Sequence, residues 1–271
     1  MIYNRPEYWL RKEEKPREAF LTFSSPNAFS ISAPKNWDGV LEYSTNNTSW
    51  TEWDGSEISS ASLNGEHILY LSGTGNTKIT GDADYPYTWS ITGTDIKCSG
   101  DIDTILDYAT VEDGKRPAIT EGCYAYMFQG CTGLTQAPDL PATTLAKYCY
   151  ASMFQGCTGL TQAPALPATM LVDNCYDSMF YGCTGLTQAP ALPATTLADY
   201  CYASMFRGCS KIKLSTTETG EYTQSYRIPT SGDGTTTTNS LSNMFAETGG
   251  TFTGTPSINT TYYLSNTNTI V

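Results

Sequence analysis

A segment of 26 residues recurs four times in this chain, and this repetition limits the folds open to it more than any other feature. Every copy contains Cys-Tyr-x-x-Met-Phe-x-Gly-Cys, beginning at Cys123, Cys149, Cys175 or Cys201. Thr-Gly-Leu-Thr-Gln-Ala-Pro-x-Leu-Pro-Ala-Thr follows three of the copies. Self-similarity at a fixed period of this length is typical of proteins whose units stack and pack only on their neighbours. The sequence therefore predicts a short solenoid.

The spacing of apolar residues within one copy predicts a helix followed by a strand. In the second copy these residues form two rows with a spacing of four: Leu145, Cys149 and Met153, then Ala146, Tyr150 and Phe154. Two adjacent rows at that spacing make one wide apolar face on a helix. We expect a threonine, Thr143 or Thr144, to cap the start of this helix and Gly156 to end it. Residues 160–163 are long enough for one short strand.

The repeated pattern is similar to that of a known family. Met-Phe-x-Gly-Cys-Thr-Gly-Leu-Thr, followed by Ala-Pro-x-Leu-Pro-Ala-Thr, resembles the BspA-like leucine-rich repeats of bacterial surface proteins. It also resembles the related 26-residue surface-protein repeat of gut bacteria and their phages. Phe128, Cys131 and Leu134 stand at signature positions, and the resemblance covers roughly residues 120–212. It implies a leucine-rich-repeat solenoid that serves in adhesion or ligand binding.

The chain outside the repeats divides into regions of different composition. Charged residues interrupt any secretion signal in residues 1–19, so we expect a disordered or helical lead-in, or a segment that attaches to a larger assembly. Residues 20–94 contain short alternating segments with glycine and asparagine turns, which predict an immunoglobulin-like β-sandwich. Residues 95–122 and 213–271 are expected to cap the repeats at 123–212. Trp50 and Trp53 of a predicted hairpin are either core residues or a sugar-stacking face.

The predicted fold class is therefore α+β and multidomain. It consists of an N-terminal immunoglobulin-like β-sandwich followed by a short leucine-rich-repeat solenoid, with a helix and a short strand in each 26-residue repeat and a cap at each end.

Charge and hydropathy bear on the partners. The 271 residues carry a formal net charge of −12. An acidic surface repels phosphate backbones, so we expect no nucleic-acid partner. No stretch approaches about 18 consecutive apolar residues, which predicts no membrane insertion. The expected partners are a bacterial surface glycan or protein and, through residues 1–19, other virion proteins, while the oligomeric state is left open.

Nine cysteines raise the question of a metal or redox site. The two cysteines of each copy are eight residues apart, no Cys-x-x-Cys occurs, and the single histidine, His67, lies outside the repeats. Zinc spacing rules are unmet, so buried thiols are favoured over disulfides and over metal binding. The aspartates at 95, 101, 103 and 107 fit a calcium loop poorly, and we expect Asp101 or Asp103 to cap a helix instead. We expect no metal and no cofactor.

The candidates for ligand contact are positions that change from copy to copy and two polar positions in the strand. Most changing positions fall on the expected helix surface or at its ends, where a partner would be met. The strand positions form a ladder that is either ligand-binding or purely structural. The candidate ligand-binding residues are Thr135, Gln136, Thr161, Gln162, Thr187, Gln188, Tyr148, Tyr181, Tyr200 and Arg207. No arrangement typical of a catalytic site occurs, so no catalytic residue is assigned.

These features together predict a non-enzymatic binding or adhesion protein. The first hypothesis is a phage or prophage virion component, such as a tail-tip or fibre receptor-binding protein that recognises a bacterial surface ligand through the repeats. The lack of a recognisable export signal in this chain favours it. The alternative is a bacterial cell-surface leucine-rich-repeat adhesin that binds a host protein or glycan. A third hypothesis is an enzyme or inhibitor with the repeats as a recognition arm.

Overall fold

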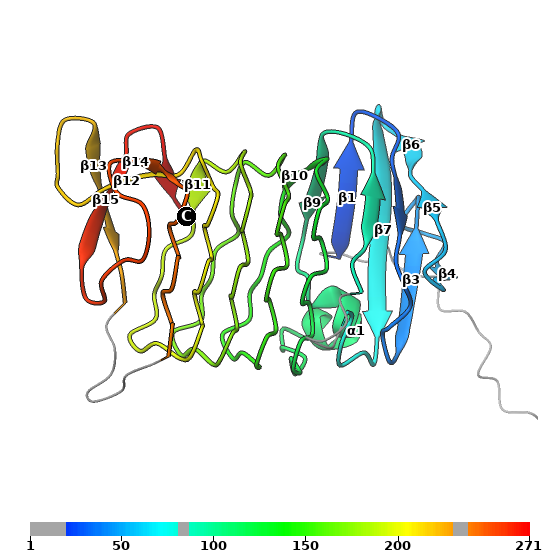
Figure 1. Cartoon of the computed structure of the whole chain (residues 1–271). Coiled ribbons are helices and arrows are strands. Elements are labelled where there is room, and N and C mark those ends of the chain that lie inside the picture. The colour runs from blue at the N-terminus through cyan, green and yellow to red at the C-terminus, as the bar shows by residue number, and fades with distance from the viewer. Residues whose placement is uncertain (1–19, 81–86, 230–237) are drawn as a thin grey trace, which may run out of the picture.

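The computed structural model describes residues 20–80, 87–229 and 238–271, and most regular structure in these ranges is strand (Figure 1). The attachment segment predicted at residues 1–19 lies outside the described residues. Within the described ranges, no helix has the length and apolar character needed to cross a bilayer.

Two sheets form the N-terminal part of the chain. The larger has the order β10–β9–β1–β7–β3–β4, with β6 also paired to β7. Its strands are β1 (Leu21–Ser25), β3 (Val40–Ser44), β4 (Thr51–Glu52), β6 (Ala61–Leu63), β7 (Glu66–Thr74), β9 (Ile96–Ser99) and β10 (Leu134–Gln136). The smaller sheet contains β2 (Ser30–Ser32), β5 (Ile58–Ser59) and β8 (Ser90–Thr92). The region is β-rich, as the sequence predicted, and β3 and β4 form the expected hairpin.

Tryptophans fill the core of this region. Trp53 is 1% exposed, stacks on Trp37 with ring centroids 5.4 Å apart, and meets Trp89 edge-on at 5.2 Å. Trp50, three residues earlier, is half-buried and packs edge-on against Phe20 at 5.7 Å. Trp53 is therefore a core residue and not part of a sugar-stacking face.

The large sheet continues into the repeats. Strand β9 pairs in parallel with β10, and β10 belongs to the first copy. Ile96 N donates to Gly133 O at 2.9 Å, and Trp89 N donates to Met127 O at the same distance. Cys98, in β9, lies buried beside this junction. The N-terminal region thus provides the surface on which the first copy packs.

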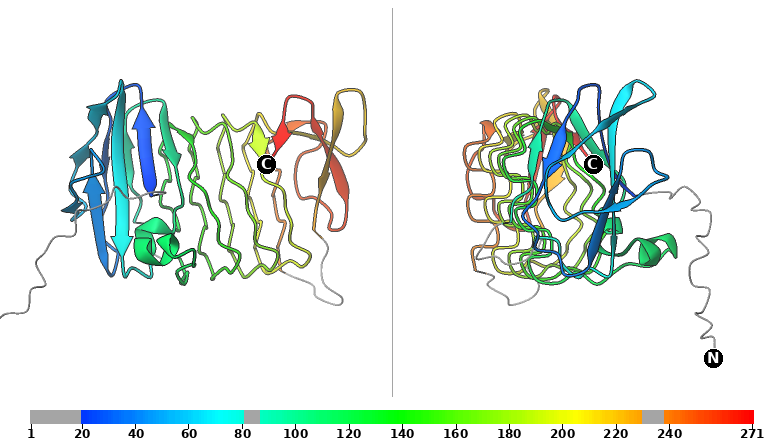
Figure 2. Two further views of the ribbon diagram at one scale, coloured as in Figure 1. Left: turned by 180° about the vertical axis from the view of Figure 1, so that it is seen from behind. Right: turned by 90° about the vertical axis from the view of Figure 1, so that its right-hand side faces the viewer.

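The prediction of a helix in every copy is wrong, because these segments bond to the neighbouring copy rather than to themselves. Tyr124 N donates to Cys149 O, and Phe128 N donates to Met153 O, both at 2.9 Å. The amides in between bond only three residues back, as Met127 N does to Tyr124 O at 3.2 Å. Successive copies therefore lie side by side, and the loops follow one another along one axis (Figures 1 and 2).

Every fourth residue of these segments has a positive φ, which no α-helix accommodates. In the four copies these residues are Gly122, Tyr126, Gly130, Tyr148, Ser152, Gly156, Asn174, Ser178, Gly182, Tyr200, Ser204 and Gly208. The predicted fold class, a β-sandwich followed by a leucine-rich-repeat solenoid with one helix per repeat, is accordingly wrong. The described residues form a β-rich chain with several small sheets and one helix.

The inward side chains of the copies stack on their equivalents. The tyrosine row has ring centroids 5.5–5.8 Å apart, and the phenylalanine row 5.5–5.7 Å. The rows consist of Tyr124, Tyr150, Tyr176 and Tyr202, and of Phe128, Phe154, Phe180, Phe206 and Phe245. Burial of these rings excludes water from the amides that link the copies, and it contributes apolar stabilisation.

The cysteines are buried free thiols. In the second to fourth copies, one thiol donates to a backbone carbonyl of the preceding copy. Cys157 Sγ donates to Phe128 O at 2.9 Å, and Cys183 Sγ donates to Phe154 O at 3.0 Å. Burial raises the pKa of all nine thiols, and that of Cys149 to about 12. The prediction that the cysteines are buried thiols is therefore confirmed.

The short strand positions of the first three copies lie in one parallel row. Isolated bridges join Gln136 to Gln162 and Gln162 to Gln188. The row ends with β11 (Gln188–Ala189), which pairs with the C-terminal strand β16 (Thr269–Ile270). A strand is therefore formed at two of the positions predicted for it, and it is only two or three residues long there.

The C-terminal region adds one more turn of the stack. Ser242-Asn-Met-Phe repeats the Met-Phe pair of the copies once more, 39 residues after Met205 rather than 26, and Phe206 N donates to Met244 O at 2.9 Å. A four-stranded sheet of order β13–β15–β12–β14 follows. Its strands are β12 (Lys213–Ser215), β13 (Tyr222–Arg227), β14 (Gly249–Gly250) and β15 (Thr261–Ser265). The buried Asn268 side chain joins this end to the repeats through bonds to Thr187 O and Lys211 O.

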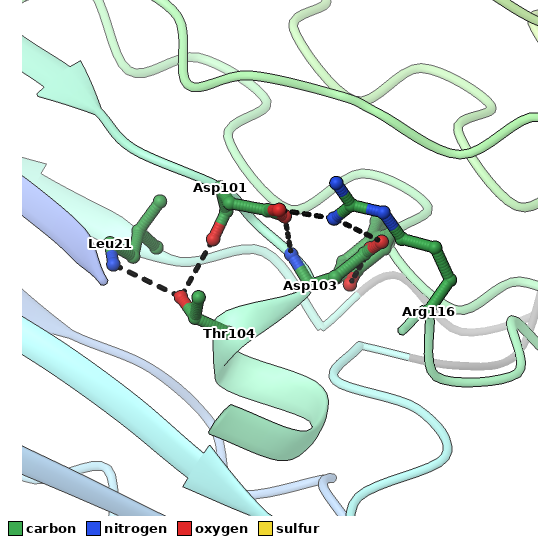
Figure 3. A network of polar contacts seen from close by, with 6 residues as sticks. Leu21, Asp101, Asp103, Thr104 and Arg116 are labelled. Carbon is green, nitrogen blue, oxygen red and sulfur yellow. Dashed lines mark hydrogen bonds and ion pairs between the residues drawn. The ribbon is translucent and has the colours of Figure 1, made fainter. Parts of the chain in front are cut away.

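The single helix described, α1 (Thr104–Glu112), follows β9 and packs against β7. Asp103 occupies its N-cap position but makes no side-chain cap bond. Asp101, the other candidate for capping, accepts a 2.9 Å bond from Asp103 N through Oδ1 just before the helix. Instead, Asp103 Oδ1 accepts a 3.1 Å bond from the Tyr124 hydroxyl, and Arg116 pairs with both aspartates (Figure 3). The carboxylate therefore faces the first repeat.

In the first three copies, the second cysteine is followed two residues later by a glycine that lets neighbouring copies approach closely. This close approach gives a first prediction. A Cβ on Gly159 would lie 2.3 Å from Thr132 O of the preceding copy. We expect Gly159→Ala to lower the free energy of unfolding by about 1–3 kcal/mol because the copies must separate locally. Urea denaturation followed by tryptophan fluorescence measures this.

Gly220→Ala is the matched control, because nothing lies within 4 Å of its added Cβ. We expect this control to change stability by less than about 0.5 kcal/mol. Equal effects of the two substitutions would show that the copies do not approach through this turn.

A second prediction concerns the thiols. Because the thiolate is the reactive form and burial disfavours it, we expect essentially none of the nine cysteines to react with Ellman's reagent at pH 8 in the native protein. All nine should react after unfolding in guanidinium chloride. Rapid reaction of several thiols in the native state would contradict the buried arrangement.

A third prediction follows from Asp103. Burial, aided by the nearby charge of Asp101, raises its pKa to about 6, against opposing contributions from Tyr124 and Arg116. Between about pH 4 and pH 6 the folded state therefore binds more protons at this group than the unfolded state, so stability falls as pH rises. We expect the stability of the wild type relative to Asp103→Asn to decrease by about 2 kcal/mol from pH 4 to pH 7.

Urea denaturation of both proteins across this pH range tests the prediction. Subtracting the variant's profile removes the contributions of carboxylates with lowered pKa, such as Asp38 and Asp107, which have the opposite sign. The prediction would be contradicted if the stability of the wild type relative to Asp103→Asn stayed constant or rose with pH.

Candidate ligand-binding surface

One face of the stack is made of the residues between and beside the buried pairs of each copy. In the segments 122–130, 148–156, 174–182 and 200–208, the Cys-Tyr and Met-Phe pairs are buried, whereas the residues between and beside them range from buried, as Ala125 and Ala151 are, to exposed. We call the residues between and beside these pairs, together with the adjoining positions 121, 147, 173 and 199, the turn face. Its middle rows contain mainly alanine and serine, whereas its two outer rows contain larger side chains. The outer rows include the positions that change from copy to copy.

The outer row at the end of each segment contains Gln129, Gln155, Tyr181 and Arg207. Gln129 Nε2 donates to Gln155 Oε1 at 2.7 Å. The Arg207 guanidinium lies over the Tyr181 ring, 5.6 Å from its centroid, and forms an ion pair with Glu247 at 2.8 Å. This row therefore presents amide, phenol and guanidinium groups on the surface. The ion pair with Glu247 holds the Arg207 guanidinium in place.

The outer row at the start of each segment has a different composition. Lys147 Nζ lies 5.3 Å from the centroid of the Tyr148 ring. The Tyr200 hydroxyl accepts a 2.9 Å bond from Asn239 Nδ2, and its side chain is 38% exposed. Asn174, the equivalent of these tyrosines in the third copy, is buried. Tyr148 and Tyr200 are consequently separated by one copy and do not form a continuous aromatic strip.

The threonines of the strand row have internal partners. Thr161 Oγ1 donates to Thr135 O, and Thr187 Oγ1 donates to Thr161 O, both at 3.2 Å. Thr135 Oγ1 donates to Ile96 O at 3.1 Å. These hydroxyls tie each copy to the preceding strand, which favours the structural interpretation of the threonine ladder.

The glutamines of the strand row, by contrast, reach the surface. Gln162 is exposed, and Gln136 and Gln188 are half-buried. In each copy a turn at 130–133, or its equivalent, separates this row from the turn face. The structure thus brings Tyr181 and Arg207 together and places the other candidates in separate rows. Ligand binding by any of them stays a prediction.

Sequence reasoning did not include Gln129, Gln155 and Glu247 among the candidates. The first two occupy the same changing position as Tyr181 and Arg207, so the comparison of copies already pointed to them. Glu247 could be found only through the 39-residue echo, because that spacing places the fifth turn beside the fourth copy.

Acidic and thiol groups do not gather as a metal site. Among the residues that the structure describes, no group of three or more His, Cys, Asp or Glu side chains could hold a metal ion. Asp107 binds the amides of Gly75 and Thr110 instead of joining the other aspartates, with its oxygens 3.0 and 2.9 Å from the two nitrogens. His67 Nδ1 lies 3.4 Å from Ser60 Oγ at a strand edge. These contacts stabilise loops and strand ends.

Comparison of the chain with protein-family models, with curated proteins and with solved structures gave no match. The resemblance to BspA-like repeats therefore stays a prediction that rests on the motif.

Proposed function

We propose that this chain is a non-enzymatic binding module that recognises a bacterial surface glycan through the turn face. The observation that carries the proposal is the division of side chains within each copy. Inward residues are nearly the same in all copies and pack on one another, whereas the outer rows of the turn face change in residue type. A surface that varies on a constant frame is suited to contact with a partner.

The chemistry of the outer rows supports a glycan. Tyr181, Tyr200 and Arg207 offer aromatic faces and planar donors, which are typical contact residues at binding surfaces. Equivalent positions of the outer rows lie in register from copy to copy, so a polymer can contact several copies at once. The net charge of −12 favours a neutral or cationic polymer over a phosphate-rich one.

Placement on a phage particle, as part of a tail tip or fibre, is the second part of the proposal. It rests on the resemblance to repeats that occur in phage and gut-bacterial proteins. A bacterial cell-surface adhesin with the same turn face is the alternative placement, and gene neighbours that encode tail proteins would distinguish the two.

A glycan array and binding to whole bacterial cells test the proposal. The key variant is Tyr181→Gln combined with Arg207→Gln, since the first two copies carry glutamine at this position and the fold should accept it. We expect affinity for the bound glycan to fall at least about tenfold, because aromatic and arginine contacts contribute most to such interfaces. Thermal unfolding of the variant confirms that it remains folded.

Gln162→Ser is the control, because Gln162 is an exposed residue of the strand row rather than of the turn face. We expect its affinity to equal that of the wild type. Full affinity in the double variant, or loss in the control, would overturn the assignment of the turn face. Cleavage of the bound glycan by the purified protein would overturn the non-enzymatic part.

A further inference from the structure

A cavity of about 240 Å³ lies where α1, the segment after it and the first copy meet. We call it the junction cavity. Its lining residues are Asp103, Arg116, Pro117, Ala118, Ile119, Ala142, Thr143 and Thr144. Sites for drug-sized ligands are typically about 300–1,000 Å³, so this cavity suits a smaller molecule. It is separate from the turn face, so a ligand bound here is independent of the proposed function.

The Asp103 carboxylate is the most unusual group in the junction cavity. Its side chain is 0% exposed. Oδ1 accepts the bond from Tyr124, but Oδ2 accepts no hydrogen bond within the described residues, and its contact with Arg116 Nη1 is an ion pair at 3.6 Å. A buried carboxylate oxygen without a hydrogen bond is costly, so a donor supplied from outside would stabilise it.

The charges at the junction cavity do not balance. Arg116 is the only cation among the lining residues, and its closest partner is Asp101, with Asp103 further away (Figure 3). Two carboxylates therefore share one guanidinium, and the oxygen left over belongs to the buried one. The chain's net charge of −12 also attracts small cations toward this surface.

The geometry favours an ammonium group over a metal ion. A calcium ion takes about six to eight oxygen ligands, and the described residues contain no cluster of acidic side chains that could provide them. An ammonium group has three donors and no acceptor. One carboxylate oxygen and the hydroxyls of Thr143 and Thr144 at the exposed rim supply matching acceptors.

We propose that the junction cavity binds a small molecule that carries a primary ammonium group, with the ammonium on Asp103 Oδ2. The apolar side chains of Pro117, Ile119 and Ala142 then pack against the body of the ligand.

Isothermal titration of the full chain at pH 7 with glucosamine and with glucose tests the proposal, because the two probes differ in one ammonium group. We expect glucosamine to bind at least about tenfold more tightly than glucose. Asp103→Asn should remove this preference, while its amide oxygen can still accept the bond from Tyr124. Ala118→Phe, at an exposed lining position, should block the cavity and abolish binding of glucosamine.

Asp113→Asn is the matched control, since Asp113 is exposed and does not line the cavity; it should bind glucosamine as the wild type does. Absence of glucosamine binding, equal affinity for the two sugars, or unchanged binding in Ala118→Phe would each overturn the proposal. If Asp103→Asn does not fold, the outcome with Ala118→Phe and the comparison of the two probes decide.

Discussion

Backbone hydrogen bonds between equivalent residues of neighbouring copies hold this protein together. In the first copy, the amides of alternate residues from Gly122 to Gly130 all donate to carbonyls of the second copy. These bonds keep one register through the four copies, in line with the period of 26 residues, and they continue into the next turn although its spacing is 39 residues. The stacked rings and buried thiols depend on the same register, because each packs against or bonds to its neighbour in the next copy.

Both ends of the stack are built from unrelated sequence that adopts the same bonding. On the N-terminal side, Trp89 takes the place of a repeat phenylalanine against Phe128, and Ile96 lies beside Leu134. On the C-terminal side, Met244 and Phe245 continue the rows of the fourth copy. The apolar flanks of the first and last copies are thereby covered, as a stack of this kind requires.

Much of this organisation could be predicted from the sequence, and the main error has an identifiable cause. The stacking of copies, the buried cysteines and the β3–β4 hairpin all followed from periodicity and composition. The helix did not, because a spacing of four over two steps is also typical of a helix. In a helix each step of four residues turns about 40° beyond a full circle, so Leu145 and Cys157 would lie about 120° apart. A spacing of four held over three steps therefore fits a chain that bends every fourth residue. The role of Asp103 could not be predicted, since it depends on Tyr124 and Arg116, which only the fold brings to it.

The pairing of β16 with β11 affects how these molecules meet one another. A strand row open at its last member would offer unpaired amides and carbonyls to any other copy of the chain, and such edges seed aggregation. Here residues 269–270 of the same chain occupy that position, and Asn268 fixes them there. The outer edge that β16 presents is only two residues long, and short edge strands are one of the ways in which proteins avoid pairing with other chains.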